Sequence, residues 1–147
     1  TVTSKHLAIF GFAFKKDTGD TRETAAGAVC ADLVREGASL HIYDPKVERE
    51  QMFIELDYSF ETSEKTVPGV QSMMITETDP YECTKGAHAI AVLTEWDEFK
   101  TLDYERIFSQ MAKPAFIFDG RNILDHDKLR EIGYEVYAIG KPMKREF

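Results

Sequence analysis

The sequence predicts an α/β domain, with a mostly parallel sheet of about five or six strands and helices on both faces. Two observations predict this fold class. Short apolar runs alternate with helix-like stretches, and such an alternation folds through right-handed βαβ crossovers that place neighbouring strands parallel. The chain has 147 residues, of which 43% are hydrophobic and 30% charged, an ordinary size and composition for one globular domain. We therefore expect residues 1–147 to form a single domain.

The first half of the chain opens the alternation. His6 to Phe10 has the pattern of a buried strand, and a loop with Gly11 follows it. From Arg22 to Glu36 the apolar positions recur at i, i+3, i+4, i+7 and i+8, which is one face of a helix. Gly37 stands where such a helix ends. Ser39 to Tyr43 is the second expected strand.

A second helix is expected from the Asp44–Pro45 pair to about Leu56. An aspartate is a favoured helix N-cap, and proline fits the first helical position. The next stretch, 57–70, is polar and contains Pro68-Gly69, which indicates a surface excursion with little structure.

The second half repeats the alternation. The predicted elements are strands at 73–76, 87–93, 115–118 and 135–139, a short helix from Asp79–Pro80, helical structure in two pieces over 96–111, and a helix at 125–132. Together they predict a three-layer α/β/α domain of Rossmann-like type. In such folds ligands bind outside the carboxyl ends of the strands, which nominates the loops after Phe10, Leu93 and Phe118.

Charge and composition exclude several classes of protein. The net charge is −8, with 26 acidic against 18 basic residues, so a nucleic-acid partner is not expected. No run approaches the roughly 18 apolar residues of a membrane span, and no signal peptide opens the chain. Two cysteines, Cys30 and Cys83, fit a reduced compartment, so we expect a cytoplasmic protein. The four histidines lack metal-ligand spacing, and no metal is expected.

The loop from Gly11 to Glu23 departs from a dinucleotide-binding fingerprint. Ala13 and Lys16 stand where the second and third glycines of GxGxxG belong. Asp44 ends the second strand as the acid of an NAD site does, although the same residue also suits a helix cap. Lys15 and Lys16 lie just past the first strand, where an ammonium can contact sugar hydroxyls or phosphates, or can simply be solvated.

Two arginines have both a functional and a structural interpretation. Arg22 stands at a helix start, where a cation opposes the helix dipole, and it either contacts a ligand or pairs with Asp20 or Glu23. Arg121 follows Gly120 at a strand end, where its planar fork suits a phosphate. The structural alternative for Arg121 is a pair with Asp119.

The remaining candidates have mainly structural interpretations. Trp96 either walls the ligand crevice or packs in the core. Cys30 lies on the buried face of the first helix, and Cys83 has no basic neighbour in sequence, so neither is expected to be a nucleophile. His88 precedes a buried strand and is expected to be structural. We therefore expect no catalytic residue in this chain.

Several stretches, in the correct order along nearly the whole chain, resemble the C-terminal domain of eukaryotic UDP-glucose 6-dehydrogenases. These stretches are GFAFKKDTGDTRE (Gly11 to Glu23), HIYDPKV (His41 to Val47), DPYE (Asp79 to Glu82), GAHAI and LTEWDEF (Gly86 to Phe99), LDYERI (Leu102 to Ile107) and KPAFIFDGRN (Lys113 to Asn122). The chain is identified as resembling the UDP-sugar-binding part of that family. Only the region around residues 57–76 departs noticeably.

The resemblance implies a parent enzyme that oxidises UDP-glucose to UDP-glucuronate in two NAD-dependent steps. It assigns Phe14, Lys15 and Arg121 to the bound UDP-sugar, and Arg22 to NAD across a domain interface. In the family, the NAD-binding domain and the catalytic cysteine precede this segment, so the isolated chain is expected to be inactive and to bind UDP-sugar weakly. Expected partners are UDP-glucose, the rest of the polypeptide and further copies in a dimer or hexamer.

Three alternatives stay open at this point. The chain could be a stand-alone nucleotide-sugar-binding or regulatory module that kept the fold. It could be a complete small dinucleotide-binding domain, although the broken glycine pattern disfavours this. It could also be a purely structural assembly module. Thr1, in place of a start methionine, favours a segment of a longer chain.

Overall fold

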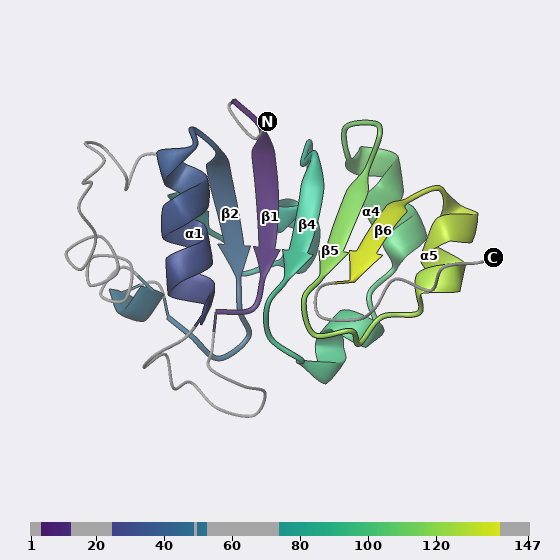
Figure 1. Ribbon diagram of the computed structural model, residues 1–147. Coiled ribbons are helices and arrows are strands. Elements are labelled where there is room, and N and C mark those ends of the chain that lie inside the picture. The colour runs from purple at the N-terminus through teal and green to yellow at the C-terminus, as the bar shows by residue number, and fades with distance from the viewer. Residues whose placement is uncertain (1–3, 13–24, 49, 53–73, 139–147) are drawn as a thin grey trace.

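The computed structural model describes residues 4–12, 25–48, 50–52 and 74–138. Six parallel strands form one sheet in the order β3-β2-β1-β4-β5-β6 (Figure 1). Their bounds are β1 His6–Phe10, β2 Ser39–Tyr43, β3 Met74–Thr76, β4 Ala89–Val92, β5 Phe116–Asp119 and β6 Glu135–Ala138. The predicted parallel α/β sheet is confirmed, and its strands coincide with the apolar runs to within one or two residues.

The strand order reverses direction at the middle of the sheet. From β1 the chain moves outward through β2 to β3, and it then returns to place β4 on the other side of β1. Phe10 is therefore the register partner of both Tyr43 and Val92. The carboxyl ends of β1 and β4 form the topological switch point of the fold, because the connections leave them in opposite directions.

Helices cover both faces of the sheet. Their bounds are α1 Ala25–Arg35, α3 Pro80–Cys83, the 3-10 helix η2 Asp97–Lys100, α4 Tyr104–Gln110 and α5 His126–Ile132. Figure 1 shows α1 beside β2 at the left of the sheet, whereas α4 and α5 lie at the β5–β6 end. The two-piece prediction for 96–111 is confirmed by η2 and α4. Of the helices in the described ranges, none has the length and apolar character to cross a bilayer.

The core is built by the buried sides of the strands and the helices facing them. Phe10 of β1 stacks on Phe99 of η2 with ring centroids 5.0 Å apart, and Tyr43 of β2 meets Phe99 edge-on at 6.1 Å. Ile107 of α4 and Ile117 of β5 are completely buried. Because these contacts join β1, β2 and η2 just below the strand ends, they fix the loops above them.

The helix predicted from Asp44–Pro45 does not begin there. Residues 45 and 46 form a bend, and helical backbone is found at 50–52. The Asp44 carboxylate accepts hydrogen bonds from the backbone N–H groups of Lys46 and Val47, at 2.8 and 3.1 Å. The aspartate therefore closes a turn, which uses the same side-chain chemistry as a helix cap. The predicted excursion at 57–70 lies outside the described residues.

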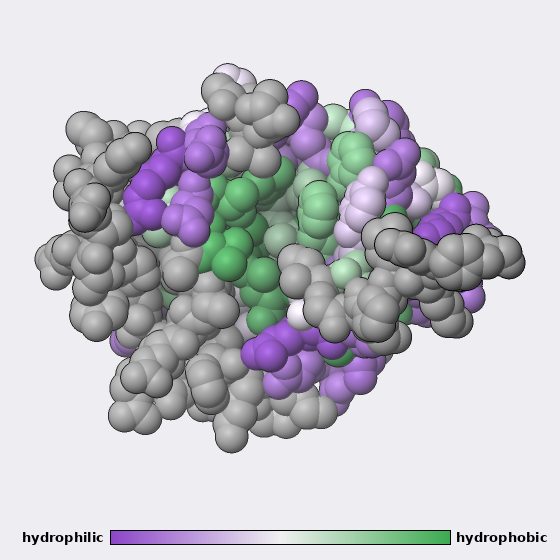
Figure 2. All heavy atoms as spheres, viewed as in Figure 1, coloured by the Kyte–Doolittle hydropathy of each residue, from purple (hydrophilic) through white to green (hydrophobic). Residues whose placement is uncertain are grey.

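One part of the sheet carries aromatic side chains on the α1 side. Phe116 and Phe118 of β5 and Tyr137 of β6 stack in a row, with the rings of Phe118 and Tyr137 5.4 Å apart. Phe118 is 37% exposed and Tyr137 45%. No helix of the described ranges lies over β5 and β6 on this side. Figure 2 shows that apolar surface is also open in the middle of the same view, mostly to the left of β5 and β6. We call these three residues the aromatic face.

Candidate functional site

The loops after β1, β4 and β5 meet at one edge of the sheet. Backbone hydrogen bonds continue the strand ladder into them: Gly11 N–H donates to Tyr43 O at 2.8 Å, and Leu93 N–H donates to Phe10 O at 2.9 Å. Gly120 N–H donates to a carbonyl of β4, Val92 O, at 2.9 Å. The structure thus brings together the three loops that the sequence nominated, around the switch point.

Two glycines allow these loops to approach so closely. Gly11 has φ +98°, and a Cβ placed there would lie 2.5 Å from Cβ of Thr94. At Gly120 a Cβ would lie 2.8 Å from the carbonyl oxygen of Val92. Any larger residue at either position would force the loops apart. The glycines therefore build the edge where a ligand is expected.

Asp44 joins the loops after β1, β2 and β4. Its Oδ2 accepts from the N–H of Phe12 at 2.7 Å and from Nε1 of Trp96 at 3.0 Å, while Oδ1 takes the two turn N–H groups described above. Both Asp44 and Trp96 are buried. The packing interpretation of Trp96 is therefore confirmed. With its carboxylate committed to protein donors, Asp44 does not fit the acid of a dinucleotide site.

Arg121 stands at the switch point with two partners from the loop after β4. Its Nε–H donates to the carbonyl oxygen of Leu93 at 3.1 Å, and Nε lies 3.2 Å from Oε2 of Glu95. The side chains of Arg121 and Glu95 are 40% and 29% exposed. A guanidinium held at the strand ends and open to solvent can bind an anion.

The alternative that pairs the Arg121 side chain with Asp119 is wrong. Asp119 is fully buried, and its carboxylate accepts the backbone N–H groups of Arg121 and Leu124, at 3.3 and 2.9 Å. Nε2 of His126 lies 2.8 Å from the same carboxylate. Asp119 and His126 thus shape the loop that carries Arg121. The sequence analysis missed Glu95 and His126, although Glu95 belongs to a loop it had nominated.

The other predicted binding residues lie outside the described residues. These are Phe14, Lys15 and Arg22, all in the segment that follows Phe12. Their roles stay predictions. Gly11 and Phe12, the last described residues before that segment, are fixed by hydrogen bonds to Tyr43 O and Asp44.

Neither cysteine of the chain is activated. Both are free and buried. Burial raises the pKa of Cys30 to about 12. Burial, followed by the charge of Glu77, also raises the pKa of Cys83. The sequence-based interpretation of both as inert thiols is confirmed, because a nucleophile needs access and a positive environment.

Three histidines gather at the opposite, amino-terminal end of the central strands. The rings of His6 and His41 lie 3.9 Å apart, and Nδ1 of His88 accepts the backbone N–H of His6 at 3.0 Å. Burial, with the neighbouring His41 and His88, lowers the pKa of His6 to about 4. His88 is structural, as predicted. Within the described ranges, no group of three or more histidine, cysteine, aspartate or glutamate side chains is arranged to hold a metal.

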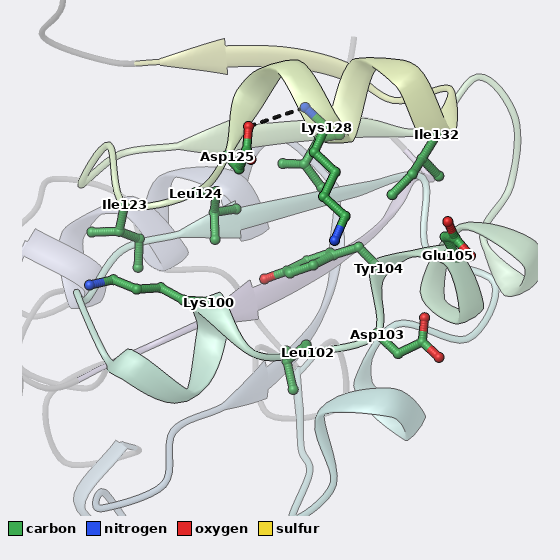
Figure 3. Close-up of a pocket in the computed structure, with 11 residues that line it drawn as sticks. Lys100, Leu102, Asp103, Tyr104, Glu105, Ile123, Leu124, Asp125, Lys128 and Ile132 are labelled. Atoms are coloured by element: carbon green, nitrogen blue, oxygen red, sulfur yellow. Dashed lines mark hydrogen bonds between the residues drawn. The ribbon is translucent and has the colours of Figure 1, made fainter.

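A separate cavity of about 390 Å³ opens between η2, α4 and α5. Figure 3 shows Lys128 reaching from α5 toward the ring of Tyr104, while Lys100 extends toward Ile123. The lining also contains three acids, Asp103, Glu105 and Asp125. Lys100 itself is paired with Asp97 at 3.2 Å. These charges do not favour an anion, so the switch point is the better candidate for one.

Comparison with known proteins identifies relatives. Residues 8–126 match the model of the UDP-glucose/GDP-mannose dehydrogenase family, UDP binding domain. UDP-glucose 6-dehydrogenase 1 of Glycine max is 54% identical over 97% of this chain, and UDP-glucose 6-dehydrogenase of Drosophila melanogaster is 53% identical over 99%. The chain spans only 31% and 30% of the length of these relatives.

The fold is also similar to solved structures. The NDP-N-acetyl-D-galactosaminuronic acid dehydrogenase of Methanosarcina mazei Go1 matches with a TM-score of 0.72 and 26% sequence identity. The match covers 95% of this chain and 25% of that protein. In all these relatives, therefore, a domain of this kind is one part of a longer polypeptide.

Proposed function

Because the chain belongs to the UDP-glucose/GDP-mannose dehydrogenase family and matches its UDP binding domain, we propose that it binds the diphosphate of a UDP-sugar at the switch point. The observation that carries the proposal is the position of Arg121. Its guanidinium stands at the carboxyl ends of β4 and β5, anchored by Nε to Leu93 O. A planar fork fixed in this way suits the paired oxygens of a phosphate.

Phe14 and Lys15 complete the proposed sugar-nucleotide site. Both follow Gly11 and Phe12 within a few residues, and they match the pair that contacts substrate in the family the chain resembles. An ammonium from Lys15 would contact the sugar, and Arg121 the diphosphate. Arg22 is proposed to touch NAD, which the NAD-binding part of the parent would mainly hold.

The parent polypeptide is proposed to be an NAD-dependent UDP-glucose 6-dehydrogenase, which converts UDP-glucose to UDP-glucuronate with two NAD. The 53–54% identity to enzymes of that name supports this assignment. The two free, buried cysteines support a reducing, cytoplasmic location. Since this chain offers no activated thiol among its described residues, it is proposed to be inactive alone. NADH formation from UDP-glucose and NAD by the isolated chain would contradict that.

The aromatic face supports a contact with the rest of the same polypeptide. Phe118 and Tyr137 expose apolar surface area. Burying this area against another part of a longer chain, such as the relatives have, would be favourable. In the parent enzyme, Phe118→Ser with Tyr137→Ser should lower the unfolding temperature by several degrees more than in the isolated chain. An equal effect in both proteins would remove this partner surface from the proposal. Further copies, in a dimer or hexamer, are the other proposed partners.

The binding proposal is tested by titrating the isolated chain with UDP. Arg121→Gln removes the charge and should weaken UDP binding about tenfold to a hundredfold, the loss expected for charge-assisted hydrogen bonds. Arg130→Gln is the matched control, because Arg130 is a half-exposed arginine of α5 that bonds Val136 O, away from the switch point. Equal affinity of UDP for both variants would contradict the proposal.

A further inference from the structure

We propose that Glu95 is the resident counter-ion of Arg121 and that its charge opposes the binding of a diphosphate there. The inference rests on the proposed function, since it concerns the same arginine. Oε2 of Glu95 lies 3.2 Å from Nε of Arg121. The carboxylate thus lies beside the guanidinium that an anionic ligand needs, on its Nε side.

The orientation of Arg121 does not require Glu95. The Nε–H donates to the carbonyl oxygen of Leu93, a backbone group of the loop after β4. The backbone of Arg121 is fixed separately, because its N–H donates to the buried carboxylate of Asp119. Removing the charge of Glu95 therefore leaves both anchors of Arg121 in place. Glu95 contributes charge where Leu93 and Asp119 contribute geometry.

The next acids along the chain, at the start of η2, have other partners. Asp97 pairs with Lys100 at 3.2 Å, and Glu98 accepts the hydroxyl of Tyr43 at 2.5 Å. Among the described residues, Glu95 is the carboxylate recorded in an ion pair with the Arg121 guanidinium. Its effect on a ligand is therefore separable from theirs.

The exposure of the pair lets an anion approach Arg121 while Glu95 stays close. With side chains 40% and 29% exposed, the ion pair is weakened by water and contributes little to stability. A diphosphate carries more charge than one carboxylate and accepts two parallel hydrogen bonds. Glu95 nevertheless opposes its approach by like-charge repulsion over a few ångströms. The predicted result is a site whose affinity depends on the ligand's charge, and Glu95 sets that dependence.

The test is a set of NMR titrations of the 147-residue chain with UDP and with uridine, which lacks the diphosphate. Glu95→Gln keeps the shape of the side chain and should tighten UDP binding about threefold to tenfold, with the gain shrinking at high salt. Asp97→Asn, the matched control, makes the same change of net charge two residues away, at the start of η2, and should stay within about twofold of wild type. Uridine affinity should be the same for wild type and Glu95→Gln.

A double-mutant cycle separates this inference from the function it rests on. In the Arg121→Gln background, Glu95→Gln should no longer tighten UDP binding. Unchanged or weaker UDP binding by Glu95→Gln overturns the counter-ion role, and so does an equal gain from Asp97→Asn. If Arg121→Gln binds UDP as well as wild type, or wild type shows no UDP binding at millimolar concentration, the proposed function itself fails. A loss with Arg121→Gln but no gain with Glu95→Gln removes only the counter-ion role.

Discussion

Single buried carboxylates determine how the switch point is built. Asp44 joins the loops after β1, β2 and β4 through hydrogen bonds to Phe12, Lys46, Val47 and Trp96. Asp119 performs the same task after β5, where it fixes the turn below Arg121. Acids that hold loops in this way leave the binding chemistry to the cations around them. This arrangement is consistent with the proposal that an acidic protein binds an anion here.

Asp44→Asn should lower the free energy of unfolding by about 1–3 kcal/mol. One carboxylate oxygen becomes an NH₂ group, which then faces N–H donors instead of accepting from them. Urea unfolding monitored by Trp96 fluorescence measures the effect. Asp97→Asn, an exposed change in the same part of the fold, should cost less than about 0.5 kcal/mol. Equal losses of unfolding free energy for the two variants would mean that the hydrogen bonds of Asp44 do not stabilise the fold.

His6 should make the protein less stable in acid. Its pKa is lowered from 6.5 to about 4, first by burial and then by His41 and His88, so the unfolded chain binds the proton more tightly. Stability from this group is complete above pH 6.5 and is lost as the pH falls toward 4. Unfolding free energies measured across that window should fall with pH for wild type and fall less for His6→Phe. Parallel pH curves would contradict the assignment.

The amino-acid sequence alone predicted only some of the residues of the candidate site. Arg121 was expected at a strand end because Gly120 and a buried strand precede it. Its partner Glu95 was not expected, because Glu95 lies 26 positions earlier in the sequence. The two side chains come together only once β4 and β5 have paired. The link from Asp119 to His126 was missed for another reason. A histidine at a helix start has no sequence feature that shows which way its ring points.

At the scale of elements, local sequence patterns predicted those strands and helices that depend mainly on interactions between residues close in sequence. The alternation placed all six strands, and Asp79–Pro80 begins α3 as expected. The same Asp-Pro signal failed at 44–45. There the carboxylate found donors on neighbouring loops, and the chain turned instead of starting a helix. A short motif with two local solutions is decided by tertiary contacts.

Gly11→Ala should be clearly more damaging than Gly86→Ala. Both glycines have positive φ, +98° and +70°, so each change adds about 1–2 kcal/mol of backbone strain. Only at Gly11 would the new Cβ collide with Thr94, since nothing lies within 4 Å of the same position at Gly86. Total losses of about 2–5 kcal/mol are expected for Gly11→Ala. Thermal unfolding of the two variants measures these losses of stability. Equal losses would contradict a tight contact between the loops after β1 and β4.

For the whole molecule, strand order decides where the candidate site lies. The sequence predicted parallel strands, but the order β3-β2-β1-β4-β5-β6 depends on which strand pairs with which across long separations. Once β4 lies beside β1, their loops and that of β5 converge, and the candidate site follows. The cavity between η2, α4 and α5 lies apart from that convergence. The two locations make different predictions for where UDP binds.

Amide NMR mapping of UDP binding tests the central claim most directly. The chain is assigned and titrated with UDP at millimolar concentration, with NAD as a parallel ligand. Binding at the switch point predicts the largest UDP shifts at Gly11, Thr94 and Gly120–Arg121, with little effect from NAD. Shifts confined to Lys100, Tyr104 and Lys128, around the separate cavity, would contradict the account.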